Sequence, residues 1–160
     1  MKKVLVFGGF GFLGYYLVHE LLKRGYEVTV ADIHENEKLE SNITFIKCDI
    51  TSKENVENVF ENKQFDFVYN LAGFANLDTA IKYPIETMQL NVIGNMYILK
   101  QCVKNKISRF VYASSAYAMS NKGSFYGISK LASEKIIEEY LKKYSLPFTI
   151  LRYGSVYSER

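Results

Sequence analysis

A run of glycines near the N-terminus constrains the fold of this chain more than any other feature. Val4 to Phe7 is a short apolar segment typical of a buried strand, and Gly8-Gly9-Phe10-Gly11-Phe12-Leu13-Gly14 follows it directly. A helix over 12–24, with leucines at helical spacing, is predicted to open inside this run. Glycine allows a tight turn and lets backbone N–H groups approach a pyrophosphate, while the helix N-terminus adds positive potential. The run therefore predicts a phosphate-binding loop between a strand and a helix.

Strands and helices alternate along the rest of the chain. Apolar segments rich in Val, Ile and Phe predict further strands over 27–31, 43–47, 67–70, 109–113 and 147–152. Helices are expected over 53–62, 78–105 and 124–144, with Pro84 marking a start or a kink in the second, and 34–42 is expected to be a loop or a short helix. Ile128, Leu131, Ile136, Ile137 and Leu141 are expected to line the apolar faces of the third. This α/β alternation predicts a doubly wound parallel sheet, the Rossmann fold, with strand order 3-2-1-4-5-6.

The second predicted strand ends at an acidic residue. Asp32 stands 18 positions after Gly14. A carboxylate there can accept hydrogen bonds from the adenosine ribose hydroxyls and would repel a 2′-phosphate, which favours NAD over NADP. The alternative is that Gly8 to Gly14 is only a tight turn and Asp32 a solvated strand end. The agreement of loop, helix and acid favours the cofactor interpretation.

A second group of residues has the composition of a proton-transfer site. Tyr126 and Lys130 are four residues apart and so share one helix face. A free phenol has a pKa near 10, and a nearby ammonium group favours the phenolate. Ser114 and Ser115 end the fifth strand, at the sheet edge where such folds bind ligands. A Tyr–Lys pair alone is usually structural, but its order after the glycine loop, the acid and the serines makes coincidence less credible.

Composition excludes several other classes of function. The net charge of +3 is dispersed, with Lys and Glu interleaved, so no nucleic-acid patch stands out. We see no apolar run of membrane-spanning length and no signal peptide, so no membrane is expected and the default location is cytoplasmic. The two cysteines and two histidines lack metal-ligand spacing, so no metal site is predicted.

Taken together, the motifs resemble the extended short-chain dehydrogenase/reductase family in its NAD-dependent epimerase/dehydratase branch, over the whole chain. The resemblance is carried by the glycine loop, Cys48-Asp49-Ile50 beside adenine, Asn70-Leu71-Ala72-Gly73, Asn91-Val92-Ile93-Gly94, Phe110 to Ala116, and Arg152-Tyr153. It implies Ser115 rather than Ser114, with Tyr126 and Lys130, as the catalytic residues. It implies that the residues holding NAD are Gly8, Gly11, Phe12, Leu13, Gly14, Asp32, Ile33, Asp49, Ile50, Leu71, Ala72, Gly73, Asn91, Tyr126, Lys130 and Tyr153.

The resemblance also implies an activity. Its substrate would be a sugar attached to a nucleotide, oxidised transiently by NAD at a hydroxyl and then epimerised, dehydrated or reduced. Sugar 4,6-dehydratases usually carry acidic residues where Ala116 and Tyr117 follow Ser115, so epimerase or reductase chemistry is favoured. Two alternatives stay open: a non-catalytic NAD-binding module, and a truncated fragment of such an enzyme.

The sequence departs from the family pattern in three places. Tyr126 follows Ser115 by 11 positions, a shorter gap than usual, so the intervening substrate loop is trimmed. Ser155 replaces an Asn that contacts substrate in relatives, and Ser158-Glu159 replaces Gly-Pro. Relatives continue beyond the position of Arg160, so residues 1–160 are expected to be the NAD-binding domain without the substrate domain. A homodimer through 78–105 and 124–144 is a further expectation.

Overall fold

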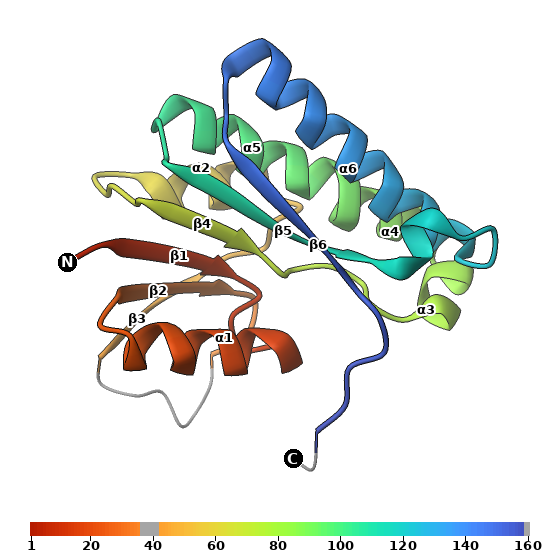
Figure 1. The fold of residues 1–160 in the computed structure, drawn as a ribbon, viewed down its shortest axis with the longest axis horizontal. Coiled ribbons are helices and arrows are strands. Elements are labelled where there is room, and N and C mark those ends of the chain that lie inside the picture. Colours follow the sequence, from red (N-terminus) through yellow and green to blue (C-terminus); the bar gives the residue numbers. More distant parts are fainter. Residues whose placement is uncertain (36–41, 159–160) are drawn as a thin grey trace.

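The chain folds around a six-stranded parallel sheet (Figure 1), seen in a computed structural model that describes residues 1–35 and 42–158. The strands stand in the order β3-β2-β1-β4-β5-β6, which confirms the predicted doubly wound topology. They are β1 (Lys3–Phe7), β2 (Glu27–Asp32), β3 (Ile43–Lys47), β4 (Phe67–Asn70), β5 (Arg109–Ser115) and β6 (Phe148–Tyr153). Part of the expected 34–42 loop and Glu159 lie outside the described residues.

Both faces of β1 are buried, as its continuous apolar run requires. Val4 and Val6 belong to one apolar cluster with α1 (Phe12–Lys23), while Leu5 and Phe7 belong to a second cluster on the other face. Helices α2 (Lys53–Phe60), α5 (Asn95–Lys104) and α6 (Ser124–Tyr144) contribute to that second cluster and lie together above the sheet in Figure 1. Because side chains alternate along a strand, a parallel strand covered on both faces must be apolar throughout.

The helical region expected over 78–105 is broken into short pieces. It comprises α3 (Leu77–Lys82), α4 (Pro84–Met88), the π-helical η1 (Gln89–Gly94) and α5. Pro84 is the first residue of α4, so it marks a helix start, because proline lacks the N–H that an interior position would need. Asn91 lies in the π-helical turn, a rare conformation that is frequent at functional sites.

The buried face of α6 differs from the expected one. Ile128 and Leu141 are 57% and 43% exposed, and of the five predicted apolar residues Ile137 is the one that is fully buried. The residues of α6 that face the protein interior are instead mostly polar: Tyr126, Gly127, Ser129, Lys130, Ser133, Glu134 and Ile137. The expectation holds for Ile136 and Ile137, which pack in or against the second apolar cluster, and was wrong for Ile128, Leu131 and Leu141, which are exposed. The N-terminal half of this helix packs through hydrogen bonds rather than through apolar contacts.

The carboxyl ends of the strands gather the predicted site residues along one edge of the sheet. Asp32 ends β2, Tyr153 ends β6, and β5 runs two residues further than predicted, so that Ser115 is its last residue. The short 3-10 helix η2 (Ala116–Met119) follows β5 and leads towards α6. Within residues 1–35 and 42–158, no helix has both the length and the apolar character that crossing a membrane needs.

Candidate cofactor and catalytic cleft

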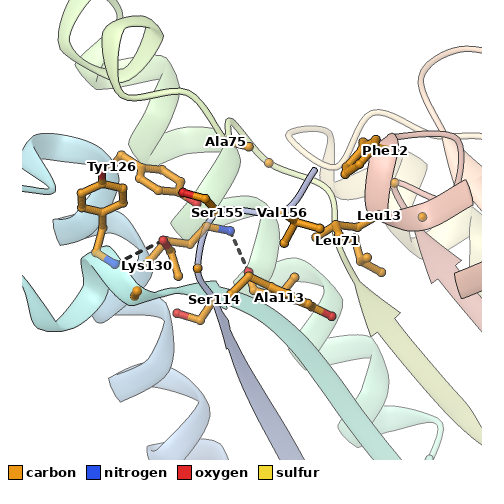
Figure 2. A pocket seen from close by; sticks show the side chains of 18 of the residues that line it. Phe12, Leu13, Leu71, Ala75, Ala113, Ser114, Tyr126, Lys130, Ser155 and Val156 are labelled. Carbon is orange, nitrogen blue, oxygen red and sulfur yellow. Dashed lines mark hydrogen bonds between the residues drawn. The ribbon is translucent and has the colours of Figure 1, made fainter. Parts of the chain in front are cut away.

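A cleft of about 740 Å³ opens along the carboxyl edge of the sheet (Figure 2). The glycine loop and the start of α1 form one end of it, and Tyr126 and Lys130 of α6 form the other. A smaller cavity of 240 Å³ adjoins it at Gly8, Leu71 and Gly73 and is lined further by Asp32, Ile33, Ile50 and Ala72. The two cavities bring together residues from both halves of the sheet in one elongated space. Most of the residues predicted to hold a cofactor line one or the other: Gly8, Phe12, Leu13, Gly14, Asp32, Ile33, Ile50, Leu71, Ala72, Gly73, Tyr126, Lys130 and Tyr153.

The glycine loop has a shape that only glycine permits. Gly8 has a φ of +74°, and a Cβ atom there would lie 2.7 Å from the backbone nitrogen of Ala72. A Cβ on Gly14 would collide with the carbonyl oxygen of Gly8. No side chain caps the start of α1, which therefore presents its N-terminus at the loop. This cradle of backbone at an uncapped helix N-terminus fits a pyrophosphate.

Asp32 lies between the glycine loop and the smaller cavity. Its carboxylate accepts a hydrogen bond from the backbone N–H of Phe10 at 3.1 Å, which ties the end of β2 to the glycine loop. It also lines the smaller cavity beside the apolar side chains of Ile33 and Ile50. A carboxylate between a phosphate cradle and an apolar slot matches the order of phosphate, ribose and adenine in a dinucleotide.

Three residues predicted to bind the cofactor do not line either cavity. Gly11 helps close the loop through its N–H, which donates to the Gly8 carbonyl at 3.2 Å. Asp49 turns one carboxylate oxygen to the backbone N–H and hydroxyl of Thr51, at 2.9 and 2.7 Å. Asn91 lies behind the cleft wall, where its Oδ1 accepts from the N–H of Phe74 at 2.8 Å. These three residues are placed to support the walls of the cavities rather than to face them.

Lys130 is buried against the catalytic end of the cleft. Its Nζ donates to the carbonyl of Ala113 at 2.8 Å, as the dashed line in Figure 2 shows. It lies 5.8 Å from the centre of the Tyr126 ring and 4.9 Å from that of Tyr112. Burial lowers the pKa of the Lys130 ammonium group to about 8. A cation in so dry a place acts strongly on neighbouring oxygen atoms.

The two serines at the end of β5 have different partners. Ser114 Oγ donates to the Glu134 carboxylate at 2.5 Å, so its proton is already engaged. Ser115 Oγ accepts from the backbone N–H of Tyr117 at 3.2 Å. Because that bond uses the oxygen as an acceptor, the Ser115 O–H proton can be donated into the cleft.

This region holds further residues outside the predicted set of site residues, of which Val156 and Glu134 went unnoticed in the sequence. Tyr117 lines the cleft with its ring centre 6.3 Å from that of Tyr126, close to where η2 presses against Gly127. Ser155 and Val156, which follow β6, line it too. Glu134 and Arg152 form an ion pair behind the wall. For Glu134 the available signal was its position four residues after Lys130, on the same helix face as Tyr126.

Comparison with known proteins identifies the family to which this chain belongs. The fold and the uncapped glycine cradle define a dinucleotide-binding protein of Rossmann type. The family model described as "NAD dependent epimerase/dehydratase family" matches residues 4–160. The chain belongs to that family, whose cofactor is the NAD expected from the sequence.

Three relatives illustrate the range of the family. The crystal structure of a Thermus thermophilus UDP-glucose 4-epimerase in complex with NAD is 30% identical, with a TM-score of 0.91 over 99% of this chain and 57% of that one. The Thermotoga maritima UDP-glucose 4-epimerase with UDP-glucose is 29% identical, with a TM-score of 0.90 over 98% and 56%. A dTDP-D-glucose 4,6-dehydratase from Dictyostelium discoideum is 26% identical over 100% of this chain and 45% of its own. The chain thus spans about half the length of the proteins that it matches.

Proposed function

We propose that this chain is the NAD-binding and proton-transfer part of an enzyme that acts on a nucleotide-linked sugar, with epimerase or reductase chemistry. The observation that carries the proposal is that the two cavities share Gly8, Leu71 and Gly73, and that their linings together extend from Asp32 to Tyr126 and Lys130. Family membership and the likeness to an epimerase crystallised with UDP-glucose support the substrate class. NAD, when bound, supplies the hydride acceptor.

The cofactor would be held by the backbone of the glycine loop at its pyrophosphate and by Asp32 at the adenosine ribose. Ile33 and Ile50 offer apolar surface for the adenine ring, which is a flat and largely apolar group. Lys130 and Tyr153 line the far end of the cleft, where the reactive half of the cofactor would lie. The carboxylate of Asp32 would repel a 2′-phosphate, so NAD is preferred to NADP.

Three side chains would handle the proton of the sugar hydroxyl. Ser115 donates a hydrogen bond to the substrate oxygen, because its own oxygen is engaged by the Tyr117 N–H. Tyr126 removes the hydroxyl proton in one direction and returns it in the other. The Lys130 ammonium group, 5.8 Å from the Tyr126 ring, stabilises the negative charge on the phenolate.

The residues after Ser115 favour epimerase or reductase chemistry over 4,6-elimination. Elimination needs an acid and a base beside the sugar in addition to the tyrosine. Ala116 has no ionisable group, and Tyr117 contributes a phenol to the cleft. This argument concerns the residue types, since the chain matches both epimerases and a 4,6-dehydratase.

Calorimetry and turnover assays test the proposal in two stages. The 160-residue chain should bind NAD with one site and bind NADP more weakly. A longer chain that includes the substrate domain should, with UDP-glucose and NAD, form either the 4-epimer or NADH. Tyr126→Phe should keep NAD binding and lose at least about a hundredfold in rate, the usual contribution of a general acid–base, while exposed Tyr144→Phe should change neither. NAD binding without turnover of any nucleotide sugar by the longer chain would instead favour a non-catalytic module, and no NAD binding would refute the proposal.

Three further features are proposed with it. Residues 1–160 would act as an NAD-binding domain that needs a substrate domain for full activity. The homodimer would form through helices within 78–105 and 124–144, and the protein would work in the cytoplasm. Size-exclusion chromatography with light scattering tests the dimer directly.

A further inference from the structure

Behind the cleft, α6 carries a carboxylate with no exposure to solvent. Glu134 is fully buried and lines neither of the two cavities that form the cofactor cleft. Its Oε1 accepts from Ser114 Oγ at 2.5 Å and from Arg152 Nε at 3.0 Å. Its Oε2 accepts from Arg152 Nη2 at 2.7 Å, which completes a two-pronged pairing. We call Ser114, Glu134 and Arg152 the buried network after its buried carboxylate, although the Arg152 side chain itself is 44% exposed.

The buried network joins the three elements that carry the proposed catalytic groups. Ser114 is on β5, Arg152 is its partner in the parallel register of β6, and Glu134 is on α6. One residue further along both strands stand Ser115 and Tyr153, which line the cleft and are also register partners.

A second hydrogen bond, made by Lys130, joins β5 and α6 next to the one made by Glu134. Lys130 precedes Glu134 by one helical turn, and Ala113 precedes Ser114 by one residue. The Lys130–Ala113 hydrogen bond and the Glu134–Ser114 hydrogen bond therefore form successive rungs between one helix and one strand. Together they fix how far α6 lies from the end of β5.

A buried, charged carboxylate such as that of Glu134 is energetically costly unless it holds its partners in defined positions. Taking a carboxylate out of water is unfavourable, and a well-packed apolar side chain is often as stable as a buried ion pair. Burial by itself would raise the pKa of the Glu134 carboxyl, but the hydrogen bonds from Arg152 and Ser114 outweigh it and hold that pKa below its usual value. Glu134 is therefore charged at neutral pH, and a charged pair accepts only a narrow range of positions for its partners.

From this arrangement we propose that Glu134 is a positioning residue, which sets the placement of Ser115, Lys130 and Tyr153 through the buried network. It touches neither cofactor nor substrate and acts through Ser114 and Arg152. The inference rests on the proposed function, since it concerns the geometry of the NAD cleft.

Calorimetric titration of the whole chain with NAD tests this inference. Glu134→Gln keeps the size of the side chain and removes its charge. The matched control is Glu138→Gln, one turn further along the same helix, which loses an exposed ion pair with Lys135 and a minor charge interaction with Arg152 but no hydrogen bond of the buried network. We expect Glu134→Gln to raise the dissociation constant of NAD about tenfold, the value of one hydrogen bond to a charged group, and Glu138→Gln to leave it unchanged.

The experiment separates positioning from a purely structural role. A structural role would lower the unfolding temperature of Glu134→Gln but leave the NAD dissociation constant unchanged at temperatures where the variant is folded, and that result would overturn the inference. Should Glu134→Gln fail to fold, Arg152→Lys decides: it keeps the positive charge but loses the two-pronged geometry. Arg152 does not line the cofactor cleft, so unchanged NAD affinity there would also overturn it. If the unaltered chain does not bind NAD, the proposed function fails first.

Discussion

Burial of Lys130 predicts an unusual dependence of stability on pH. The pKa of its ammonium group falls from the ordinary 10.5 to about 8 in the folded chain. Between these values the unfolded chain binds more protons than the folded one, so the free energy of unfolding rises with pH across this window. From these two pKa values, the charged lysine costs about 3 kcal/mol of stability at pH 7 and about 1 kcal/mol at pH 10.

The substitution Lys130→Met isolates this effect. Methionine has nearly the same length and no charge, and the hydrogen bond lost at the Ala113 carbonyl adds nearly the same amount at every pH. The stability of Lys130→Met relative to the unaltered chain should therefore fall by about 2–3 kcal/mol between pH 7 and pH 10. Urea denaturation followed by circular dichroism at both pH values measures it, with the exposed Lys135→Met as the matched control. A stability difference that does not change with pH would refute the claim that Lys130 is charged and dry in the folded chain.

Two other changes probe the cofactor end of the cleft. Gly14→Ala should lower the free energy of unfolding by about 1–3 kcal/mol, the usual cost of overpacking, and abolish NAD binding, because its Cβ would meet the Gly8 carbonyl. The control in thermal unfolding is Gly154→Ala, since no atom lies within 4 Å of the Cβ that it adds. Asp32→Asn should weaken NAD about tenfold, the value of a hydrogen bond to a charged group, and should narrow the gap between NAD and NADP in calorimetry; an unaltered preference would show that the carboxylate does not select the cofactor.

The parts of the fold that follow from local patterns were predictable. β3, β4 and α6 have the bounds expected from the sequence, because each is a periodic or apolar run that ends at a clear stop. The strand predicted to end at Ala113 continues to Ser115 in the structure, because β6 continues to pair with it, Ser114 with Arg152 and Ser115 with Tyr153. The presence of a serine in the sequence does not indicate whether a neighbouring strand will form hydrogen bonds with its backbone N–H and C=O groups.

The candidate site divides in the same way. Glycine spacing and a Tyr–Lys pair one helical turn apart are short-range patterns, so the loop and the pair could be read from the sequence. The choice of Ser115 over Ser114 came from resemblance, and the physical reason for it needs the structure: Ser114 gives its proton to Glu134. That bond joins residues 20 positions apart, and the bond from Arg152 joins residues 18 positions apart. In the sequence Glu134 shares the helix face of Tyr126 and Lys130, but the surface acid Glu138 shares it too, so this signal alone does not single out Glu134.

The two halves of α6 pack against the sheet through different interactions, and this difference explains why its functional residues lie in the N-terminal half. Near its C-terminal half Ile137 is fully buried in the main apolar cluster, with Ile136 and Tyr140 packed beside it. Near its N-terminal half the buried groups are polar, and each hydrogen bond contributes only about 1 kcal/mol net while a broken one costs more. The apolar C-terminal half can therefore hold the helix in place, while hydrogen bonds in the polar N-terminal half set the orientation of its side chains. Replacing a whole set of hydrogen-bonded partners in the polar half by apolar residues should preserve or raise stability and impair the cleft, whereas removing one partner alone should lower stability.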